Sequence, residues 1–262
     1  MHLQIVSLPI PINQEERKLR ILLPDDYEMT DKTYRVLYMH DGQNLFEDHT
    51  SFSKHSWGIF ETLVNEDIHD LIVVGIDNSD YRLFEYSPWP CSEQVKKMTK
   101  IAVGGLGDVY ASWIINQVKP FIDSNYRTKP DFENTMIAGS SMGAYISIYL
   151  ATTYPHVFST IGVFSLASWF NEEVLINHIN LSPANQKQNY FISVGQHESS
   201  DPNDPNFNEI YLNNSRKLKE VLVSRGIKNI DYMETDDIHN ELAWRKVFPY
   251  FIRFASQKNT VQ

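Results

Sequence analysis

The sequence predicts an α/β fold, a mainly parallel sheet with helices on both faces, and two observations support this. Short apolar runs of strand length alternate along the chain with longer segments in which apolar residues recur at helical spacing. The 262 residues are 42% hydrophobic and 21% charged, which is ordinary for a globular protein with a sizeable core. We therefore expect a single domain over residues 1–262.

The expected strands are apolar runs that end at turn residues. They cover residues 18–23, 35–39, 71–76, 136–138, 160–164, 190–194 and 230–233. Helical spacing predicts helices over residues 57–64, 109–124, 211–225 and 242–255, another helix after residue 143, and a kink at Pro249. Residues 81–107 show no regular pattern. Because so long an irregular segment usually serves a function, we expect it to form a rim or lid of the site.

Charge and composition exclude several classes of protein. The 23 Lys and Arg against 33 Asp and Glu give a net charge of −10, which argues against nucleic acid and anionic membranes as partners. The single cysteine, Cys91, fits a reducing compartment. Neither a transmembrane-length apolar run nor a signal-peptide pattern is present, so we expect a cytoplasmic protein.

One motif carries the strongest chemical signal. Gly139-Ser140-Ser141-Met142-Gly143 lies between a predicted strand and a predicted helix. This order of strand, G-x-S-x-G and helix is the nucleophile elbow of an α/β-hydrolase, in which a tight, strained turn exposes the serine hydroxyl. We expect a side chain at either glycine to collide with the neighbouring strand or helix. Only Ser141 has glycine at both −2 and +2, so it is the candidate nucleophile.

A serine hydroxyl is a weak nucleophile and needs a histidine base that an acid orients. In α/β-hydrolases the acid and then the histidine follow the serine along the chain. Of nine histidines, only His178, His197 and His239 leave room for an acid after Ser141. His239 lies between the last predicted strand and the last predicted helix, where this fold places its base, and it is our candidate.

Glu198 is the candidate acid, because it lies four residues after the strand predicted at 190–194. Asp201 and Asp204 are alternatives, but each precedes a proline in a segment with the composition of a turn. A solvated loop carboxylate is the ordinary alternative for Glu198. The choice between Glu198 and Asp201 stays open at this point.

Two backbone N–H groups are needed to bind the oxyanion that forms when the serine attacks. One is expected from Met142, directly after the candidate nucleophile. The other is expected from Gln43, in the loop after the strand at 35–39, where Gly42 would let the backbone approach a substrate closely.

The chain resembles the branch of the α/β-hydrolases called the putative esterases, which includes esterase D-like enzymes, enterochelin esterases and feruloyl esterases. The matching stretches are residues 36–46, 75–78, 119–123, 126–128, 139–144, 165–169 and 239–241, together with Arg82, Glu85 and Tyr86. The resemblance implies an α/β-hydrolase fold with a mainly parallel eight-stranded sheet. It also implies a triad of Ser141, Glu198 and His239 with oxyanion donors Gln43 and Met142.

Several aromatic residues lie in or near loops at the expected site. They are Trp57, Tyr81, Tyr86, Trp89 and Trp169. Packing explains each one as well as substrate contact does, but as a group they predict an apolar or aromatic acyl pocket. Arg82 is a further candidate for the pocket, although a salt bridge with Glu85 is the favoured role. His40-Asp41 has no second cluster at ligand spacing, so we expect no metal and no cofactor.

The predicted function is that of a serine carboxylesterase, which hydrolyses small or medium acyl esters through an acyl-enzyme on Ser141. The alternatives are acyl transfer by the same triad and a non-catalytic binding protein that keeps the fold. The expected partner is a small-molecule ester. The identity of that ester and the oligomeric state are left open.

Overall fold

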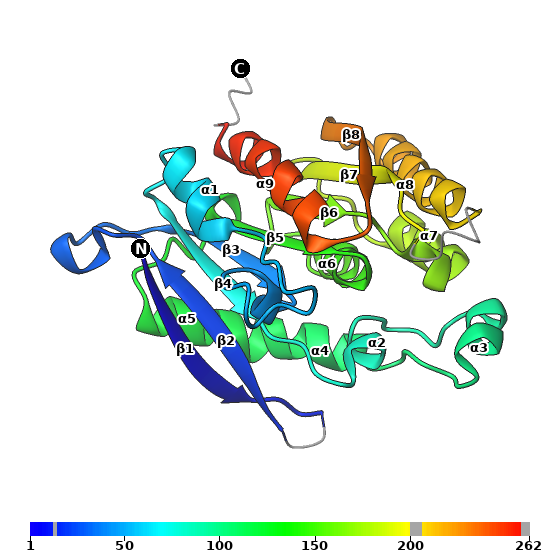
Figure 1. Ribbon diagram of the computed structural model, residues 1–262, viewed down its shortest axis with the longest axis horizontal. Coiled ribbons are helices and arrows are strands. Elements are labelled where there is room, and N and C mark those ends of the chain that lie inside the picture. Colours follow the sequence, from blue (N-terminus) through cyan, green and yellow to red (C-terminus); the bar gives the residue numbers. More distant parts are fainter. Residues whose placement is uncertain (13–14, 200–205, 258–262) are drawn as a thin grey trace.

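The computed structural model describes residues 1–12, 15–199 and 206–257. Its strands are β1 (His2–Pro9), β2 (Glu16–Leu23), β3 (Arg35–His40), β4 (Leu71–Ile76), β5 (Thr135–Ser140), β6 (Thr160–Phe164), β7 (Asn189–His197) and β8 (Asn229–Ile238). They form one sheet in the order β1-β2-β4-β3-β5-β6-β7-β8. Only β2 runs against its neighbours, and every pair from β4 to β8 is parallel, which confirms the predicted sheet (Figure 1).

Helices cover both faces of this sheet. They are α1 (Ile59–Asn65), α2 (Arg82–Glu85), α3 (Glu93–Thr99), α4 (Gly107–Trp113), α5 (Lys119–Asn125), α6 (Met142–Thr153), α7 (Glu172–Leu181), α8 (Asn206–Ser224) and α9 (Glu241–Ser256). A π-helical turn over Ile114–Val118 joins α4 to α5, so the helix predicted at 109–124 is continuous. Pro249 lies inside α9.

The alternation of side chains along each strand separates the core into two clusters. On β3, Val36 and Tyr38 enter one buried cluster, whereas Leu37 and Met39 enter the other. Residues of α4, α6, α7 and α8 complete the first cluster, and residues of α1 and α9 complete the second. Figure 1 shows α1 and α9 side by side over the sheet.

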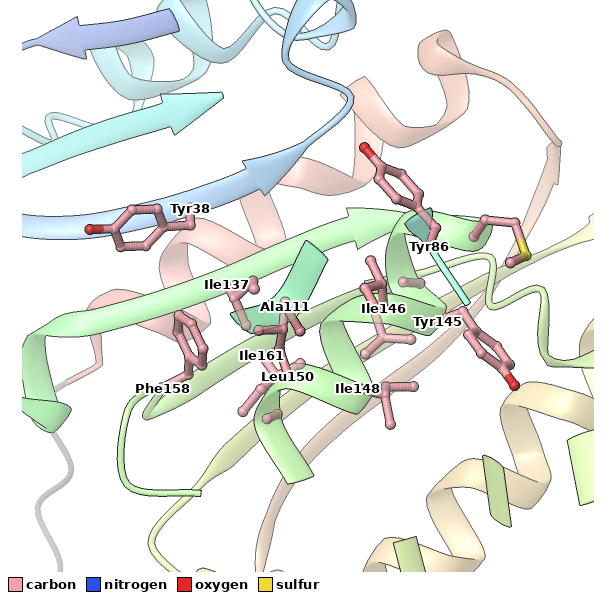
Figure 2. Close-up of a cluster of buried hydrophobic side chains, with 14 of the residues drawn as sticks. Tyr38, Tyr86, Ala111, Ile137, Tyr145, Ile146, Ile148, Leu150, Phe158 and Ile161 are labelled. Carbon is pink, nitrogen blue, oxygen red and sulfur yellow. The ribbon is translucent and has the colours of Figure 1, made fainter. Parts of the chain in front are cut away.

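The helix that follows the motif is buried on nearly all sides. Ten of the 12 residues of α6 are buried, and the helix packs against β5 and β6. Figure 2 shows Ile146 and Leu150 of this helix in the same apolar cluster as Ile137 of β5 and Ile161 of β6. A helix enclosed in this way holds its first residues, and therefore the motif, in a fixed place.

The segment at 81–107 is more ordered than the sequence predicts, because it contains α2 and α3. The expected salt bridge between Arg82 and Glu85 is wrong. The carboxylate of Glu85 is fully buried and instead accepts hydrogen bonds of 2.8 and 2.7 Å from Arg17 of β2. The pair anchors α2 to the sheet.

Outside residues 81–107, β1 and α7 were also not predicted. β1 is an edge strand with no buried residue, so it lacks the apolar run that marks a central strand. In α7 only Leu175 and Ile179 are buried, too few to establish a helical period. Within the described ranges, none of the helices has the length and apolar character needed to cross a membrane.

Candidate active site

Ser141 occupies a strained turn between β5 and α6. Its backbone has φ 57° and ψ −120°, a conformation that is unfavourable for any residue with a Cβ. The N–H of Ser141 donates to the carbonyl of Phe164 at 2.9 Å, and its own carbonyl accepts from the N–H groups of Tyr145 and Ala167. The surrounding strand and helix therefore hold the strained conformation in place.

The two glycines of the motif differ in how much space they have. A Cβ at Gly139 would lie 2.6 Å from the backbone of Gly143, so the predicted collision with the neighbouring helix holds there. A Cβ at Gly143 would lie 3.3 Å from Asp41 Oδ2 and from His40 Cβ, which is tight contact but no severe overlap. The requirement for glycine is therefore stronger before Ser141 than after it.

Adjacent parallel strands bring Glu198 and His239 together. β7 ends at His197 and β8 at Ile238, and these two residues are paired in register. Glu198 and His239 follow them directly, and Nδ1 of His239 lies 2.5 Å from Oε2 of Glu198. Glu198 thus lies at the end of β7 itself, because the strand continues beyond the predicted end at Val194. Asp201 and Asp204 lie outside the described residues.

The second oxygen of Glu198 also has partners. Oε1 accepts hydrogen bonds of 2.6 Å from the Ser165 hydroxyl and of 2.6 Å from the N–H of Gly195. The Ser165 oxygen in turn accepts a hydrogen bond of 2.9 Å from the indole N–H of Trp244. Glu198 is only 1% exposed, so these donors supply what water would otherwise provide. Neither Ser165 nor Trp244 has a role that is predicted from the sequence.

A cavity of about 460 Å³ opens beside these groups. Its lining consists of Asp41, Gln43, Asn44, Phe52, Ser53, Asn78, Arg82, Ser140, Ser141, His239, Asn240, Glu241 and Trp244. Ser141, His239 and Gln43 therefore face one space. Most of the lining side chains are polar or charged, and the aromatic ones are Phe52 and Trp244.

The structure places the other candidate pocket residues away from this cavity. Tyr86 is fully buried in the core, where its hydroxyl accepts a hydrogen bond from the N–H of Asp41. Trp89 packs against Tyr145, Tyr149 and His178. Trp169 lines a different cavity of about 400 Å³, between α3 and α8.

Neither of the remaining loop aromatics reaches the candidate site. Trp57 lies in the core against Phe164 and Phe248, whereas Tyr81 packs beside Phe84. The expected aromatic acyl pocket is therefore not built from the five predicted residues. Of the described residues in 81–107, Arg82 alone lines the cavity.

Gln43 is held tightly in the short helical turn Gly42–Asn44 that follows β3. Its side-chain Oε1 accepts from the N–H of Asn78 at 3.1 Å, and its carbonyl accepts from the Thr50 hydroxyl at 2.6 Å. A Cβ at Gly42 would lie 2.6 Å from the backbone of Gly75, so glycine is required for this loop to reach its place. Met142 is the first residue of α6, and first-turn N–H groups have no acceptor within their helix.

Asp41 and Arg82 form a charged pair in the cavity wall. Arg82 donates hydrogen bonds of 2.7 and 2.9 Å to the two carboxylate oxygens of Asp41, and Asn78 donates one of 2.6 Å. Burial alone would raise the pKa of Asp41, but the attraction and hydrogen bonds of Arg82 outweigh it and lower the pKa. Asp41 is therefore a permanent carboxylate at neutral pH.

Tyr211 of α8 completes the surroundings of His239. The two rings have centroids 4.9 Å apart, and Tyr211 is 5% exposed. Burial raises the pKa of Tyr211 to about 12, against smaller opposing effects of Trp169 and of the Ser141 hydroxyl. The phenol therefore stays protonated beside Ser141. The sequence showed Tyr211 only as the beginning of a helix.

Residues 11–253 match the protein family described as "Putative esterase". The chain belongs to this family. The resemblance drawn from the sequence motifs is thereby confirmed. A relative in Bacillus subtilis, the uncharacterized protein YbbA, is 28% identical over 183 residues, which cover 70% of this chain and 69% of YbbA.

Solved structures share the fold of this Putative esterase. The BES protein from Bacillus cereus superposes with a TM-score of 0.74 at 17% identity, covering 98% of this chain and 95% of that protein. The siderophore hydrolase EstA from Aspergillus nidulans gives a TM-score of 0.74 at 16% identity, covering 97% and 94% of the two chains. These likenesses confirm the α/β-hydrolase fold.

Proposed function

We propose that the protein is a serine carboxylesterase that works through an acyl-enzyme on Ser141. The observation that carries the proposal is the 2.5 Å contact between His239 Nδ1 and Glu198 Oε2, at a cavity that also exposes Ser141. Membership of the Putative esterase family supports the class of reaction. The strained turn at Ser141 supports its role as nucleophile, because such strain is retained where a function requires it.

In the proposed reaction, the Ser141 oxygen attacks the ester carbonyl carbon while Nε2 of His239 takes the hydroxyl proton. An ionised carboxylate only accepts hydrogen bonds, so the contact with Glu198 keeps the imidazole proton on Nδ1 and leaves Nε2 free as the base. Glu198 also stabilises the imidazolium that forms. It does not itself take the proton.

The tetrahedral intermediate carries a negative oxygen, which the backbone N–H groups of Met142 and Gln43 would bind. His239 then gives its proton to the leaving alcohol as the C–O bond breaks, and the acyl group stays on Ser141. Water attacks this acyl-enzyme by the same steps, releasing the acid and restoring the serine.

The cavity supports a small or medium ester that carries hydrogen-bonding groups. Amide side chains of Asn44, Asn78 and Asn240 lie in its lining beside the charged Arg82 and Glu241. The resemblance to a siderophore hydrolase agrees with a polar substrate of this kind.

The test is hydrolysis of p-nitrophenyl esters of increasing acyl length by the wild type, Ser141→Ala and His239→Ala. We expect both variants to lose activity by about 10³-fold or more. Ser147→Ala is the matched control, because it removes a fully buried hydroxyl from α6 that does not line the cavity. Retention of wild-type activity by Ser141→Ala would exclude the proposal.

A fluorophosphonate probe gives an independent readout of the nucleophile. We expect it to label the wild type and Ser147→Ala but not Ser141→Ala. Labelling without ester hydrolysis would point to a more specialised ester or to acyl transfer, which added alcohol would reveal as a new ester product. Absence of both labelling and hydrolysis would favour a binding protein.

A further inference from the structure

A series of hydrogen bonds joins three side chains, from Trp244 in the cavity wall through Ser165 to Oε1 of Glu198. Trp244 Nε1 lies 2.9 Å from Ser165 Oγ, and Ser165 Oγ lies 2.6 Å from Glu198 Oε1. We propose that Ser165 is a positioning residue, oriented by Trp244, that fixes the Glu198 carboxylate against His239. The inference rests on the proposed esterase function and adds to it a specific role for two residues outside the triad.

The chemistry of the three groups determines which one donates and which one accepts in each hydrogen bond of this series. An indole N–H can only donate, so Ser165 Oγ must accept from Trp244. The single hydroxyl proton of Ser165 is then directed to the carboxylate of Glu198, which can only accept. The donor and acceptor in both hydrogen bonds are therefore fixed, and the reverse direction is chemically impossible.

The backbone supports a functional reason for serine at this position. Ser165 directly follows β6 and has φ 50°, in the left-handed region that favours glycine. Its N–H donates to the carbonyl of Ser193 at 2.7 Å, which holds that conformation. A residue with a Cβ is less favourable here than glycine, which agrees with a contribution from the serine hydroxyl.

Glu198 depends on these donors for its orientation. Its side chain is fully buried, and Oε1 is bound only by Ser165 and Gly195 among the described residues. Without the Ser165 hydroxyl, Gly195 N–H alone would hold this oxygen. The carboxylate would then have freedom to rotate, and its second oxygen would leave the position that orients His239.

Trp244 connects this series of hydrogen bonds to the cavity. Its ring lies edge-on to His239 with centroids 5.1 Å apart, and it lines the cavity. One residue therefore packs against the base and, through Ser165, orients the acid. Replacement by phenylalanine keeps an aromatic ring in this place and removes the N–H donor together with part of the packing area of the indole.

The experiment compares Ser165→Ala, Ser165→Gly and Trp244→Phe, singly and as the double variant Ser165→Ala/Trp244→Phe. Ser165→Gly also lacks the hydroxyl but relaxes the backbone, so it covers the case in which Ser165→Ala folds poorly. Ser159→Ala is the matched control. Ser159 lies at the other end of β6, is equally buried at 3%, and donates its hydroxyl to backbone carbonyls instead.

We expect both Ser165 variants to lose about tenfold or more in kcat/KM, since hydrogen bonds to charged groups are the strong ones. Trp244→Phe should lose about threefold in wild type and almost nothing further in Ser165→Ala, because its donor acts through that hydroxyl. The acidic limb of the pH profile should move down, since a carboxylate that leaves its place beside His239 stabilises the imidazolium less. A merely structural role would not move that limb.

Two results would overturn the inference while leaving the esterase proposal intact. One is a Ser165→Gly protein with the kcat/KM and pH profile of Ser159→Ala. The other is an effect of Trp244→Phe that is fully retained in the Ser165→Ala background, which would show that the two side chains act independently. Failure of the esterase proposal has a different signature, namely activity that survives Ser141→Ala.

Discussion

Arg82 binds both carboxylate oxygens of Asp41, at 2.7 and 2.9 Å, and so links the start of α2 to the loop after β3. Asp41 itself is in a left-handed conformation with φ 58°, and it directly precedes the turn that carries Gln43. The position of one proposed oxyanion donor therefore depends on an ion pair with a residue 41 positions further along the chain.

Arg82→Gln should impair both activity and stability. The Asp41 side chain is 7% exposed, so loss of its cation leaves a nearly buried charge without compensation. We expect a loss of about 2 kcal/mol in the free energy of unfolding, below the range for fully buried pairs because Arg82 is 26% exposed. We also expect kcat/KM to fall about tenfold or more through Gln43. Urea denaturation and ester hydrolysis measure the two effects.

Arg216→Gln is the control for that prediction. Arg216 also binds a carboxylate through two hydrogen bonds, to Glu234, but its side chain is 45% exposed. Exposed pairs contribute about 1 kcal/mol or less. Equal effects of the two substitutions would contradict the special role of the Asp41 pair.

The two glycines around Ser141 should respond differently to alanine. Gly139→Ala should abolish most activity and destabilise the fold by about 3 kcal/mol, because its Cβ overlaps the backbone of Gly143. Gly143→Ala makes only tight contact with Asp41 and His40, and alanine is favourable within a helix. It should keep a folded protein with reduced activity. Thermal unfolding and kcat/KM rank the variants, and the reverse order would refute the packing argument.

His40 should make the protein less stable as the pH falls. Burial lowers its pKa from 6.5 to about 3, with Asp41 opposing and Arg82 reinforcing the shift. Below pH 6.5 the unfolded chain binds a proton that the folded protein does not bind until near pH 3. The stability present above pH 6.5 is therefore lost progressively as the pH falls through this window, by about 2 kcal/mol between pH 7 and pH 5.

The variant His40→Asn tests this assignment, because it removes the titrating group and retains a polar partner for Tyr110. Its free energy of unfolding should fall less between pH 7 and pH 5 than that of the wild type. Other titrating groups affect both proteins alike, so the difference isolates His40. Parallel pH dependences would show that His40 does not titrate in this way.

Phe52 should affect substrate binding without affecting the fold. Its side chain lines the cavity yet the residue is 90% exposed, and its backbone N–H is fixed by Asn44 Oδ1 at 3.0 Å. Phe52→Ala should change the free energy of unfolding by less than about 0.5 kcal/mol. It should raise KM for long acyl esters more than for acetate, since only the longer chains reach the rim.

Leu181→Ala is the control for exposed apolar area, because Leu181 is 86% exposed and lies outside the cavity lining. It should leave KM unchanged for every acyl length. Equal KM values for Phe52→Ala and the wild type across the series would remove Phe52 from the substrate path.

The sequence predicts those features that a local pattern of residues specifies, such as the positions of buried strands. The strands predicted at 71–76 and 160–164 agree to the residue with β4 and β6, because each is an uninterrupted run of buried residues. The positions of Glu198 and His239 after two strands predict that they lie close together, since the carboxyl ends of neighbouring parallel strands meet at one edge, and the structure places them in contact.

Contacts between side chains that are far apart in the sequence produce no local pattern from which they could be predicted. Arg82 and Glu85 are three residues apart and invite a local pairing, yet they point to different partners. Ser165 and Trp244 are 79 residues apart, and the sequence around each one indicates only a turn residue and a core aromatic residue. Their connection exists only once the sheet has assembled.

The two arginines of β2 give the N-terminal hairpin a part in building the site. Arg17 neutralises Glu85, and Arg20 binds Asp77 through hydrogen bonds of 2.7 and 3.1 Å. A shortened chain that began after β2 would leave both carboxylates without these partners. Asp77 directly precedes Asn78, and Glu85 lies in the same helix as Arg82. Trimming this edge of the sheet would therefore disturb the cavity beside Ser141 from a distance, and fusion partners or purification tags are better attached without removing it.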